Sequence, residues 1–237
     1  MTLYPLEPIA IIESPFREKF ATPRQPGLTP SVRARIVFRN ACATPEAVRG
    51  LEGFSHIWLI FLFHQNWRKG WKPTVRPPRL GGNKRVGVFA SRSPFRPNPI
   101  GLSAVKLLSI DCAAGEIALT VQGADLIDGT PILDIKPYIP YGDSIPDASG
   151  GFTDDTPQSR LVVEFTEQAK QQLEGFRVLF PALEQVIQET LSLDPRPAYR
   201  REGDDSTLYG AQLDRFNIRW RIKGNSAVIT DITQLSH

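Results

Sequence analysis

Cysteine and histidine are scarce in this sequence, which has two cysteines and three histidines among its 237 residues. Cys42 and Cys112 stand far apart, and the histidines do not have the spacing typical of a zinc site. The pattern therefore gives no support to a disulfide framework or to a structural zinc site. We predict free thiols, a reducing compartment and no bound metal.

Long apolar runs are missing as well. The longest, at 57–63, is far too short to cross a bilayer, and residues 1–10 lack a basic stretch followed by an apolar one. No Gly-x-Gly-x-x-Gly pattern opens a helix, which argues against a doubly wound nucleotide-binding fold. We expect a soluble cytoplasmic protein that makes no membrane contact.

Acidic residues are absent from residues 53–110, although the whole chain carries a net charge of only +3. Concentrated positive charge favours a polyanionic partner, and aromatic rings beside arginines are typical of proteins that bind single-stranded RNA. A solvated basic face is the alternative. The basic residues of this region are Arg68, Lys69, Lys72, Arg76, Arg79, Lys84, Arg85, Arg92, Arg96 and Lys106, and the aromatic residues among them include Trp67, Trp71, Phe89 and Phe95.

Three prolines and two arginines stand within eight positions at 92–99. Each proline fixes its own φ angle and restricts the residue before it, so we predict a rigid, extended loop. Arginines on a stiff backbone lose little freedom when they bind a carboxylate or a phosphate. The loop therefore suits anion recognition, and a proline-rich surface linker is the alternative.

Short β-type runs dominate the first two thirds of the chain, and clusters of glycine and proline separate them. Such spacing favours an antiparallel barrel or sandwich. We expect the wholly apolar run at 57–63 to lie in the core. The runs are at 8–12, 33–38, 56–63, 85–90, 101–110, 116–122 and 131–138.

A second unit follows residues 141–157, which are rich in Gly, Ser, Pro and Asp. A strand at 160–165 precedes a helix that Thr166 can cap, and a second helix is expected at 181–191. Strands at 216–222 and 227–232 flank a hairpin turn. We predict domains at 1–155 and 156–237, the second of α+β type. Within it, residues 194–201 form another proline-arginine segment, either a second RNA contact or a helix-to-strand connector.

Six segments together resemble the TsaA-like family over nearly the whole chain. They are Pro-Arg-Gln-Pro-Gly at 23–27, Phe-Ser-His-Ile-Trp at 54–58, Arg-Pro-Pro-Arg-Leu-Gly-Gly at 76–82, Ser-Pro-Phe-Arg-Pro-Asn-Pro-Ile-Gly at 93–101, Asp-Gly-Thr-Pro-Ile-Leu-Asp-Ile-Lys-Pro-Tyr at 128–138, and Asp-Pro-Arg-Pro-Ala-Tyr at 194–199. The bacterial form of this family is a tRNA methyltransferase. Its members that resemble this chain use S-adenosylmethionine to methylate N6 of threonylcarbamoyladenosine, the modified base just 3′ of the anticodon.

The resemblance implies a mainly β protein that acts as a homodimer. An N-terminal antiparallel β-barrel would bind the cofactor, and a small α+β domain would follow. By motif position, the implied cofactor contacts are Pro26, Gly27, Leu28, His64, Gln65, Arg92, Leu102, Gln122, Gly123, Ala124 and Asp125. Arg92 suits the carboxylate of S-adenosylmethionine, and Asp125 suits a ribose hydroxyl or the amino group. Gly27 and Gly123 would let the backbone approach the ligand closely.

The reaction that the resemblance implies is an in-line methyl transfer to a nitrogen whose proton must be accepted. Asp134, Lys136 and Tyr138 alternate in one expected strand, so they project to the same face and place an acid–base group beside a cation. Asp128 and His64 are further candidates for the base. For Asp128 the alternative interpretation is a structural role as a turn residue. The candidates for holding the threonine carboxylate are Arg92, Arg96 and Lys136.

The expected tRNA contacts are Arg76, Arg79, Arg85, Arg96, Arg196, Tyr199 and Arg200. Two other classes of function stay open. A non-catalytic RNA-binding module would show salt-dependent tRNA binding without affinity for the cofactor. A methyltransferase for a small molecule would turn over regardless of RNA.

Overall fold

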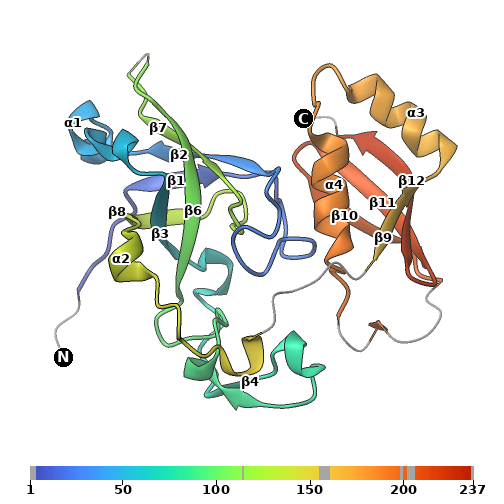
Figure 1. The fold of residues 1–237 in the computed structure, drawn as a ribbon, viewed down its shortest axis with the longest axis horizontal. Helices are drawn as coiled ribbons and strands as arrows, with labels where there is room; N and C mark the ends of the chain where they lie inside the picture. The colour runs from blue at the N-terminus through green and yellow to red at the C-terminus, as the bar shows by residue number, and fades with distance from the viewer. Residues whose placement is uncertain (1–3, 114, 155–160, 198–199, 202–205, 236–237) are drawn as a thin grey trace.

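The computed structural model describes residues 4–113, 115–154, 161–197, 200–201 and 206–235. Figure 1 shows two β-rich units side by side, the N-terminal one in blue to green and the C-terminal one in orange to red. An arm that carries the label β4 lies below the first unit (Figure 1). Among the described residues, no helix combines the length and apolar character that a membrane crossing requires.

The N-terminal unit is a closed barrel, which confirms the expected fold. Its strand order is β1-β2-β7-β6-β3-β8, and every neighbouring pair is antiparallel. The strands are β1 (Ala10–Glu13), β2 (Arg33–Phe38), β3 (His56–Leu62), β6 (Ile100–Asp111), β7 (Ala118–Gln122) and β8 (Pro131–Pro137). Closure leaves no unpaired edge in this sheet.

Strand β3 corrects the expectation that its whole apolar run lies in the core. Ile57, Leu59 and Phe61 are buried, whereas Trp58 and Ile60 are only partly covered. Successive side chains of a strand point to opposite faces, so only every second residue can enter the barrel. The other residues form an apolar outer face.

Residues 63–99, which we call the basic arm, connect β3 to β6. The strand expected at 85–90 is wrong for most of its length: only β5 (Val86–Gly87) pairs, with β4 (Thr74–Val75), and a 3-10 turn follows at Val88–Ala90. The Val88 N–H donates to the Pro73 carbonyl oxygen (3.0 Å). The chain turns after this residue, and the Val88 carbonyl oxygen accepts from the N–H and the hydroxyl of Ser91. Two further 3-10 turns lie at His64–Asn66 and Pro78–Leu80.

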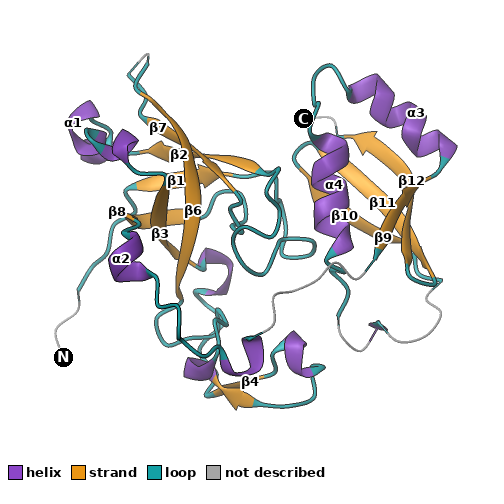
Figure 2. Cartoon of the chain, viewed as in Figure 1, coloured by secondary structure: helices purple, strands orange, loops and turns teal. Residues whose placement is uncertain are grey.

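The C-terminal unit is a four-stranded sheet with two helices, in the order β10-β11-β12-β9 (Figure 2). β12 runs parallel to β9 and antiparallel to β11. The Thr166 hydroxyl accepts from the Ala169 N–H (3.3 Å), which confirms the expected helix cap. The elements are β9 (Val162–Phe165), α3 (Glu167–Phe176), α4 (Leu183–Ser192), β10 (Tyr209–Leu213), β11 (Phe216–Lys223) and β12 (Ser226–Gln234).

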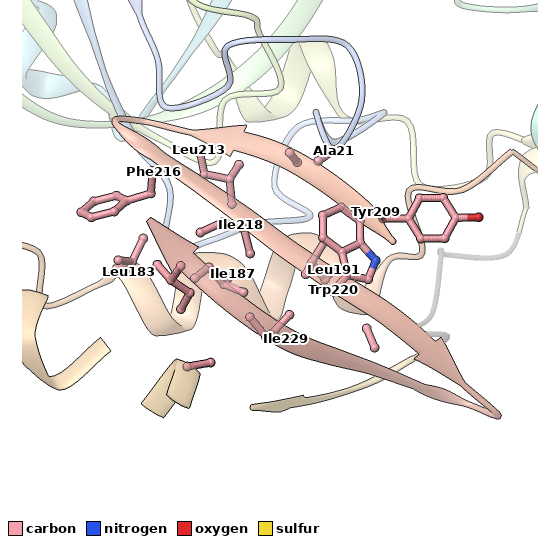
Figure 3. Packing of buried hydrophobic residues seen from close by; sticks show 14 of the residues in the cluster. Ala21, Leu183, Ile187, Leu191, Tyr209, Leu213, Phe216, Ile218, Trp220 and Ile229 are labelled. Atoms are coloured by element: carbon pink, nitrogen blue, oxygen red, sulfur yellow. The ribbon is translucent and has the colours of Figure 1, made fainter. Parts of the chain in front are cut away.

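The segment between β1 and β2 belongs to both units. Phe16, Ala21 and Val32 are buried in the hydrophobic cluster of the C-terminal sheet, where Figure 3 shows Ala21 near Tyr209. Phe16 also forms an isolated antiparallel bridge with Leu213. The packing therefore does not follow a single cut in the sequence. The boundary at 155/156 itself stays a prediction, because residues 155–160 lie outside the described ranges.

The remaining helical elements are short. They are α1 (Pro45–Val48), α2 (Pro140–Asp143), and 3-10 turns at Asn40–Cys42, Leu51–Gly53 and Gly151–Thr153.

Candidate cofactor site at one end of the barrel

One end of the barrel gathers most of the residues expected to bind the cofactor. β1, β3 and β7 end there, and β2, β6 and β8 begin there, because every neighbouring pair is antiparallel. His64 and Gln65 follow β3, Leu102 lies near the start of β6, and residues 122–125 lead out of β7. The topology therefore brings positions from three parts of the chain to one place.

The loop at 24–30 closes onto the end of β7. The Gly27 N–H donates to the Gly123 carbonyl oxygen (2.8 Å), and the Gly123 N–H donates to the Val32 carbonyl oxygen (2.9 Å). Both glycines have left-handed φ angles, 78° and 75°, and a Cβ atom at Gly123 would lie 3.2 Å from the Gly27 Cα atom. The glycines let two stretches of backbone meet, whereas we expected them to admit the ligand.

Neighbouring residues of the same loop make polar contacts as well. The Gln122 side-chain amide donates to the Pro30 carbonyl oxygen, and the Gln25 side-chain oxygen accepts from Arg92 Nη1 (2.6 Å). Pro26 and Leu28 are partly buried between these contacts. The loop, the end of β7 and the exposed Arg92 thus form one connected arrangement.

Asp125 is the one carboxylate among the expected cofactor residues. Its Oδ1 atom accepts from the Ser103 hydroxyl (2.7 Å), which points into the barrel from β6. Burial raises the pKa of Asp125 to about 6, while the Ser103 hydrogen bond and the positive charge of Arg92 act in the opposite direction. Asp125 is therefore ionised at neutral pH but gains a proton in mildly acidic solution. Ala124 beside it is fully buried.

His64 borders a basic hollow of about 430 Å³. The hollow is lined by Leu62, His64, Gln65, Trp67, Arg68 and Lys69. Burial, followed by the charge of Lys19, lowers the pKa of the His64 imidazole. The Lys19 ammonium donates to the Asn66 side-chain oxygen, and burial together with the charge of Lys69 lowers the pKa of Lys19. Positive charge from two segments therefore meets at this end of the barrel.

The three catalytic candidates lie outside the barrel. Lys136 Nζ and Asp134 Oδ2 form an ion pair at 2.8 Å, and the Tyr138 ring packs 5.6 Å from the Trp58 ring, measured between centroids. Asp134 and Lys136 pair with Ile60 and Trp58 of β3, which confirms that they share one face. Leu102 also pairs with Ile60, on the other side. Asp134 therefore stands two strand spacings, about 10 Å, from the exposed Leu102.

Asp128 is held in place by other groups. Its Oδ1 atom accepts from the Ser14 N–H (2.9 Å), and its other oxygen accepts from the Arg17 guanidinium. It joins the segment after β1 to the connection before β8. This supports the turn reading of Asp128, and His64 remains the alternative to Asp134 as a base.

The basic arm exposes aromatic rings among its cations. Trp67, Trp71 and Phe89 are 59%, 54% and 73% exposed. The Arg96 guanidinium lies over the Phe89 ring at 5.6 Å and donates to the Ser91 carbonyl oxygen (2.6 Å), so it stiffens the arm. Arg76, Arg79 and Arg85 are exposed on the same arm.

The second proline-arginine segment differs from the expectation. Arg196 is 3% exposed, and its guanidinium contacts both carboxylate oxygens of Asp194 at 2.8 and 3.0 Å. It also donates to the Arg200 carbonyl oxygen (3.1 Å). The tRNA contact expected at Arg196 is therefore corrected to an internal ion pair. Arg200 is exposed, and Tyr199 lies outside the described residues.

Sequence reasoning missed several residues of this region. Ser103 and Lys19 were marked by no motif, although Ser103 donates to Asp125 and the charge of Lys19 acts on His64. Gln25 lies within the motif at 23–27 but was not among the expected contacts. A polar Ser103 at an inward position of an apolar strand was the one local signal. Within the described ranges, no group of three or more His, Cys, Asp or Glu residues gathers as a metal site would require.

Comparison with known proteins gives one consistent family. Residues 11–144 match the tRNA-methyltransferase O N-terminal domain, and residues 158–235 match the TrmO C-terminal domain. A tRNA (adenine(37)-N6)-methyltransferase of Escherichia coli is 47% identical over 222 residues, which cover 94% of each chain. A mouse protein of the same name is 49% identical over 140 residues, 58% of this chain and 31% of that protein.

Solved structures agree with this result. The crystal structure of TrmO from Pseudomonas aeruginosa has a TM-score of 0.81 and 34% sequence identity, and the match covers 98% of this chain and 99% of that one. A putative S-adenosylmethionine-dependent methyltransferase of the same species is 45% identical over 217 residues, 91% of each chain.

Proposed function

The chain belongs to the tRNA-methyltransferase O family, and on this premise we propose that it methylates N6 of threonylcarbamoyladenosine at position 37 of tRNA. Methylation of N6 of adenine 37, with S-adenosylmethionine as the donor, is the activity of this enzyme. One relative that matches over 94% of each chain is named for methylation of adenine 37 in tRNA, and another, over 91% of each chain, is named for its dependence on S-adenosylmethionine. The threonylcarbamoyl group on the acceptor base is the part that we propose.

The observation that carries the proposal is the meeting of Arg92, Asp125 and the 24–30 loop at one end of the barrel. S-adenosylmethionine carries a carboxylate, ribose hydroxyls, an adenine and a positive sulfonium, and it supplies a methyl group that is already activated for transfer. Arg92 would hold the carboxylate. Asp125, fixed by Ser103, would accept hydrogen bonds from the ribose. Arg92 offers hydrogen-bond donors and the buried Asp125 carboxylate offers acceptors, and the cofactor carries a carboxylate and hydroxyl groups that fit the two.

The protein must then align the acceptor and remove its proton. Alignment of reacting groups can contribute about 7–11 kcal/mol to lowering a barrier. Bound S-adenosylmethionine would supply the methyl group and leave as S-adenosylhomocysteine, and N6 would give up its proton as it gains the methyl group. We propose that the Asp134 carboxylate accepts that proton and that Lys136 holds the carboxylate in place through its 2.8 Å ion pair. Tyr138 would complete the face on which the base lies.

The basic arm would bind the anticodon loop. Exposed Trp67, Trp71 and Phe89 can stack on unpaired bases, and each base–aromatic stack contributes about 1–3 kcal/mol. Arg76, Arg79 and Arg85 would contact phosphates. We propose Arg200 and Tyr199 as additional contacts from the C-terminal unit.

The basic hollow beside His64 is a candidate for the threonyl carboxylate. Lys136 is paired with Asp134, and Arg96 is bound to backbone carbonyl groups, so both are engaged elsewhere. Lys69 lines the hollow and lies close enough to Lys19 for its charge to lower the pKa of Lys19. A carboxylate placed between the two ammonium groups would relieve this repulsion.

We also propose a homodimer, as the family resemblance implies, and a cytoplasmic location, where mature tRNA is found. Sedimentation equilibrium tests the first of these. A single species with the mass of one chain at micromolar concentration would contradict the dimer.

The function is tested by methyl transfer from labelled S-adenosylmethionine to two tRNA preparations, followed by nucleoside mass analysis. One preparation carries threonylcarbamoyladenosine and the other is an unmodified transcript. Label in the modified tRNA alone supports the proposal, whereas equal label in both removes the threonylcarbamoyl requirement. Cofactor binding without label in either would favour a small-molecule acceptor, and tRNA binding without cofactor affinity would favour an RNA-binding module.

Asp134→Ala supplies the test of the base. Removing a general base costs about 10²–10⁴ in rate, and both ligands should bind as before. A wild-type transfer rate in this variant would disprove the assigned role.

A further inference from the structure

We propose that Glu189 of helix α4 is a positioning residue that holds the 24–30 loop over the cofactor site, so that the C-terminal unit sets the affinity for S-adenosylmethionine. What the loop binds rests on the proposed function. That the loop is held by the C-terminal unit rests on contacts alone.

The contact itself is a two-pronged hydrogen bond across the two units. The Ser31 N–H donates to Glu189 Oε2 (2.8 Å), and the Ser31 hydroxyl donates to Oε1 (2.7 Å). Glu189 is partly buried on α4. Hydrogen bonds to an ionised carboxylate are about twice as strong as those between neutral groups. Both oxygens of one carboxylate therefore fix a single residue at the end of the loop.

The two stems of the loop are anchored in the same unit. Before the loop, Ala21 is 5% exposed in the C-terminal hydrophobic cluster, and after it Val32 is fully buried there. Partly buried Phe20 stacks on Trp220, with ring centroids 5.8 Å apart. In Figure 1 the blue segment after β1 lies between the barrel and α4. Residues 22–31 thus form a loop whose ends belong to the C-terminal core.

The tip of the loop faces the barrel. Gly27 donates to Gly123, Gln122 donates to the Pro30 carbonyl oxygen, and Gln25 accepts from Arg92. Only three residues separate Gly27 from Ser31, so a shift at Ser31 is passed along a short stretch of backbone. Loss of the Glu189 contact is therefore expected to loosen the Gly27–Gly123 hydrogen bond and the Gln25–Arg92 contact.

The test compares Glu189→Ala with Glu184→Ala in the full-length protein. Glu184 lies on the same helix, is exposed, and accepts from Gln188 (3.4 Å), much as Glu189 accepts from Gln185 (3.3 Å). Two quantities are measured well below the melting temperature: the dissociation constant for S-adenosylmethionine, by calorimetry, and the exchange rate of the Gly27 amide, by NMR without any ligand. Melting temperatures are recorded to separate positioning from global stability.

Glu189→Ala should raise the dissociation constant about fivefold to tenfold, which corresponds to roughly 1–1.4 kcal/mol, and should speed exchange at Gly27. Glu184→Ala should change neither, and Glu189→Gln, which keeps one acceptor oxygen, should recover part of both. Ser31→Ala keeps the N–H donor and serves as a milder variant if Glu189→Ala does not fold. It should move both readouts in the same direction by a smaller factor.

Two results overturn the proposal. Unchanged affinity and unchanged Gly27 exchange in a folded Glu189→Ala protein would show that Glu189 does not position the loop. Wild-type protein without affinity for S-adenosylmethionine would remove the cofactor role together with the proposed function, while the exchange rates would still decide whether α4 holds the loop.

Discussion

The two proline-arginine segments, at 92–101 and 194–201, have similar composition and opposite environments. In the first, Arg92 is exposed and its guanidinium contacts the neutral amide of Gln25. In the second, Arg196 is 3% exposed and is paired with both oxygens of Asp194, which is 3% exposed as well.

The difference comes from the nearest carboxylate. Asp194 adopts a left-handed φ of 51°, a conformation that aspartate tolerates better than most residues, and this lets it meet an arginine two positions later. No acidic residue lies within 53–110, so the first segment has no such partner in its own stretch of chain. We propose that the stiff backbone of the first segment serves recognition, whereas the second segment forms an internal brace.

The largest effect that we expect is a loss of stability when the buried ion pair of the second segment is broken. Arg196→Ala removes the main partner of the buried Asp194 carboxylate and leaves Arg201 Nε at 3.5 Å from it. Because this second arginine still compensates part of the charge, we expect the lower end of the about 3–5 kcal/mol that breaking a buried pair costs. We expect urea unfolding to show a loss of this size, while Arg177→Ala, which removes only an exposed ion pair with Glu174, stays within about 0.5 kcal/mol. An Arg196→Ala protein as stable as wild type but defective in tRNA binding would restore the surface role.

A substitution in the first segment should instead lower the affinity for the cofactor. Arg92→Ala removes the charged contact that we propose to the cofactor carboxylate. Hydrogen bonds to charged groups contribute about 1.5–3 kcal/mol, so affinity should fall about 10- to 100-fold. Calorimetry with S-adenosylmethionine measures this. Arg92→Lys is the control that keeps the charge and should recover part of the affinity. Loss of folding in place of loss of affinity would erase the contrast between the segments.

The pH dependence of cofactor binding gives a further test of the Arg92 region. Because the pKa of Asp125 is raised to about 6, the carboxylate that we propose as an acceptor for the ribose becomes protonated as the pH falls through 6. Affinity should therefore drop between pH 7 and pH 5, and Asp125→Asn should remove that part of the pH dependence. An identical pH profile in both proteins would exclude Asp125 from the site.

The same group links pH to stability. Because its pKa is raised, Asp125 binds a proton more tightly in the folded state than in the unfolded state. This tighter binding adds to the free energy of unfolding below about pH 4, and the added stability is lost as the pH rises through about 6. The free energy of unfolding of Asp125→Asn, minus that of the wild type, should therefore be larger at pH 7 than at pH 4, by up to about 3 kcal/mol. Paired urea titrations at the two pH values measure the difference, and a wild-type pH dependence would contradict it.

The smallest effect is expected at Arg96, which lies in the first segment but braces the backbone as Arg196 does. Arg96→Ala should weaken tRNA use about threefold to tenfold, equivalent to roughly 0.7–1.4 kcal/mol, and leave cofactor affinity nearly unchanged. Steady-state kinetics with varied tRNA gives this value. Arg96→Lys keeps the charge but not the planar fork, so recovery by lysine would point to phosphate contact and not to bracing.

Local patterns in the sequence predicted much of the barrel. Strand β2 begins and ends where expected, although its alternation is only partial, since Ile36, Val37 and Phe38 are all buried. The helix after Thr166 was also marked by its cap. Strand β10 was missed, since Gly210 and Gln212 are weak strand formers and its pairing with β11 decides its conformation.

The site was predictable only in part. The resemblance gave the residues that converge at one end of the barrel, but their supporting contacts come from distant segments. Ser31 and Glu189 are 158 positions apart, and no local pattern in either segment marks such a pair. The same reason explains Arg196: composition shows an exposed-looking basic motif, and only the fold shows where the Asp194 carboxylate points.

The most direct test of this account is a crystal structure of the protein with S-adenosylmethionine bound. We expect the cofactor at the end of the barrel, with its carboxylate on Arg92, its ribose on Asp125 and the 24–30 loop against it, while Arg196 stays paired with Asp194. A cofactor bound elsewhere with Arg92 facing solvent, or an Arg196 side chain released toward the ligand, would contradict it.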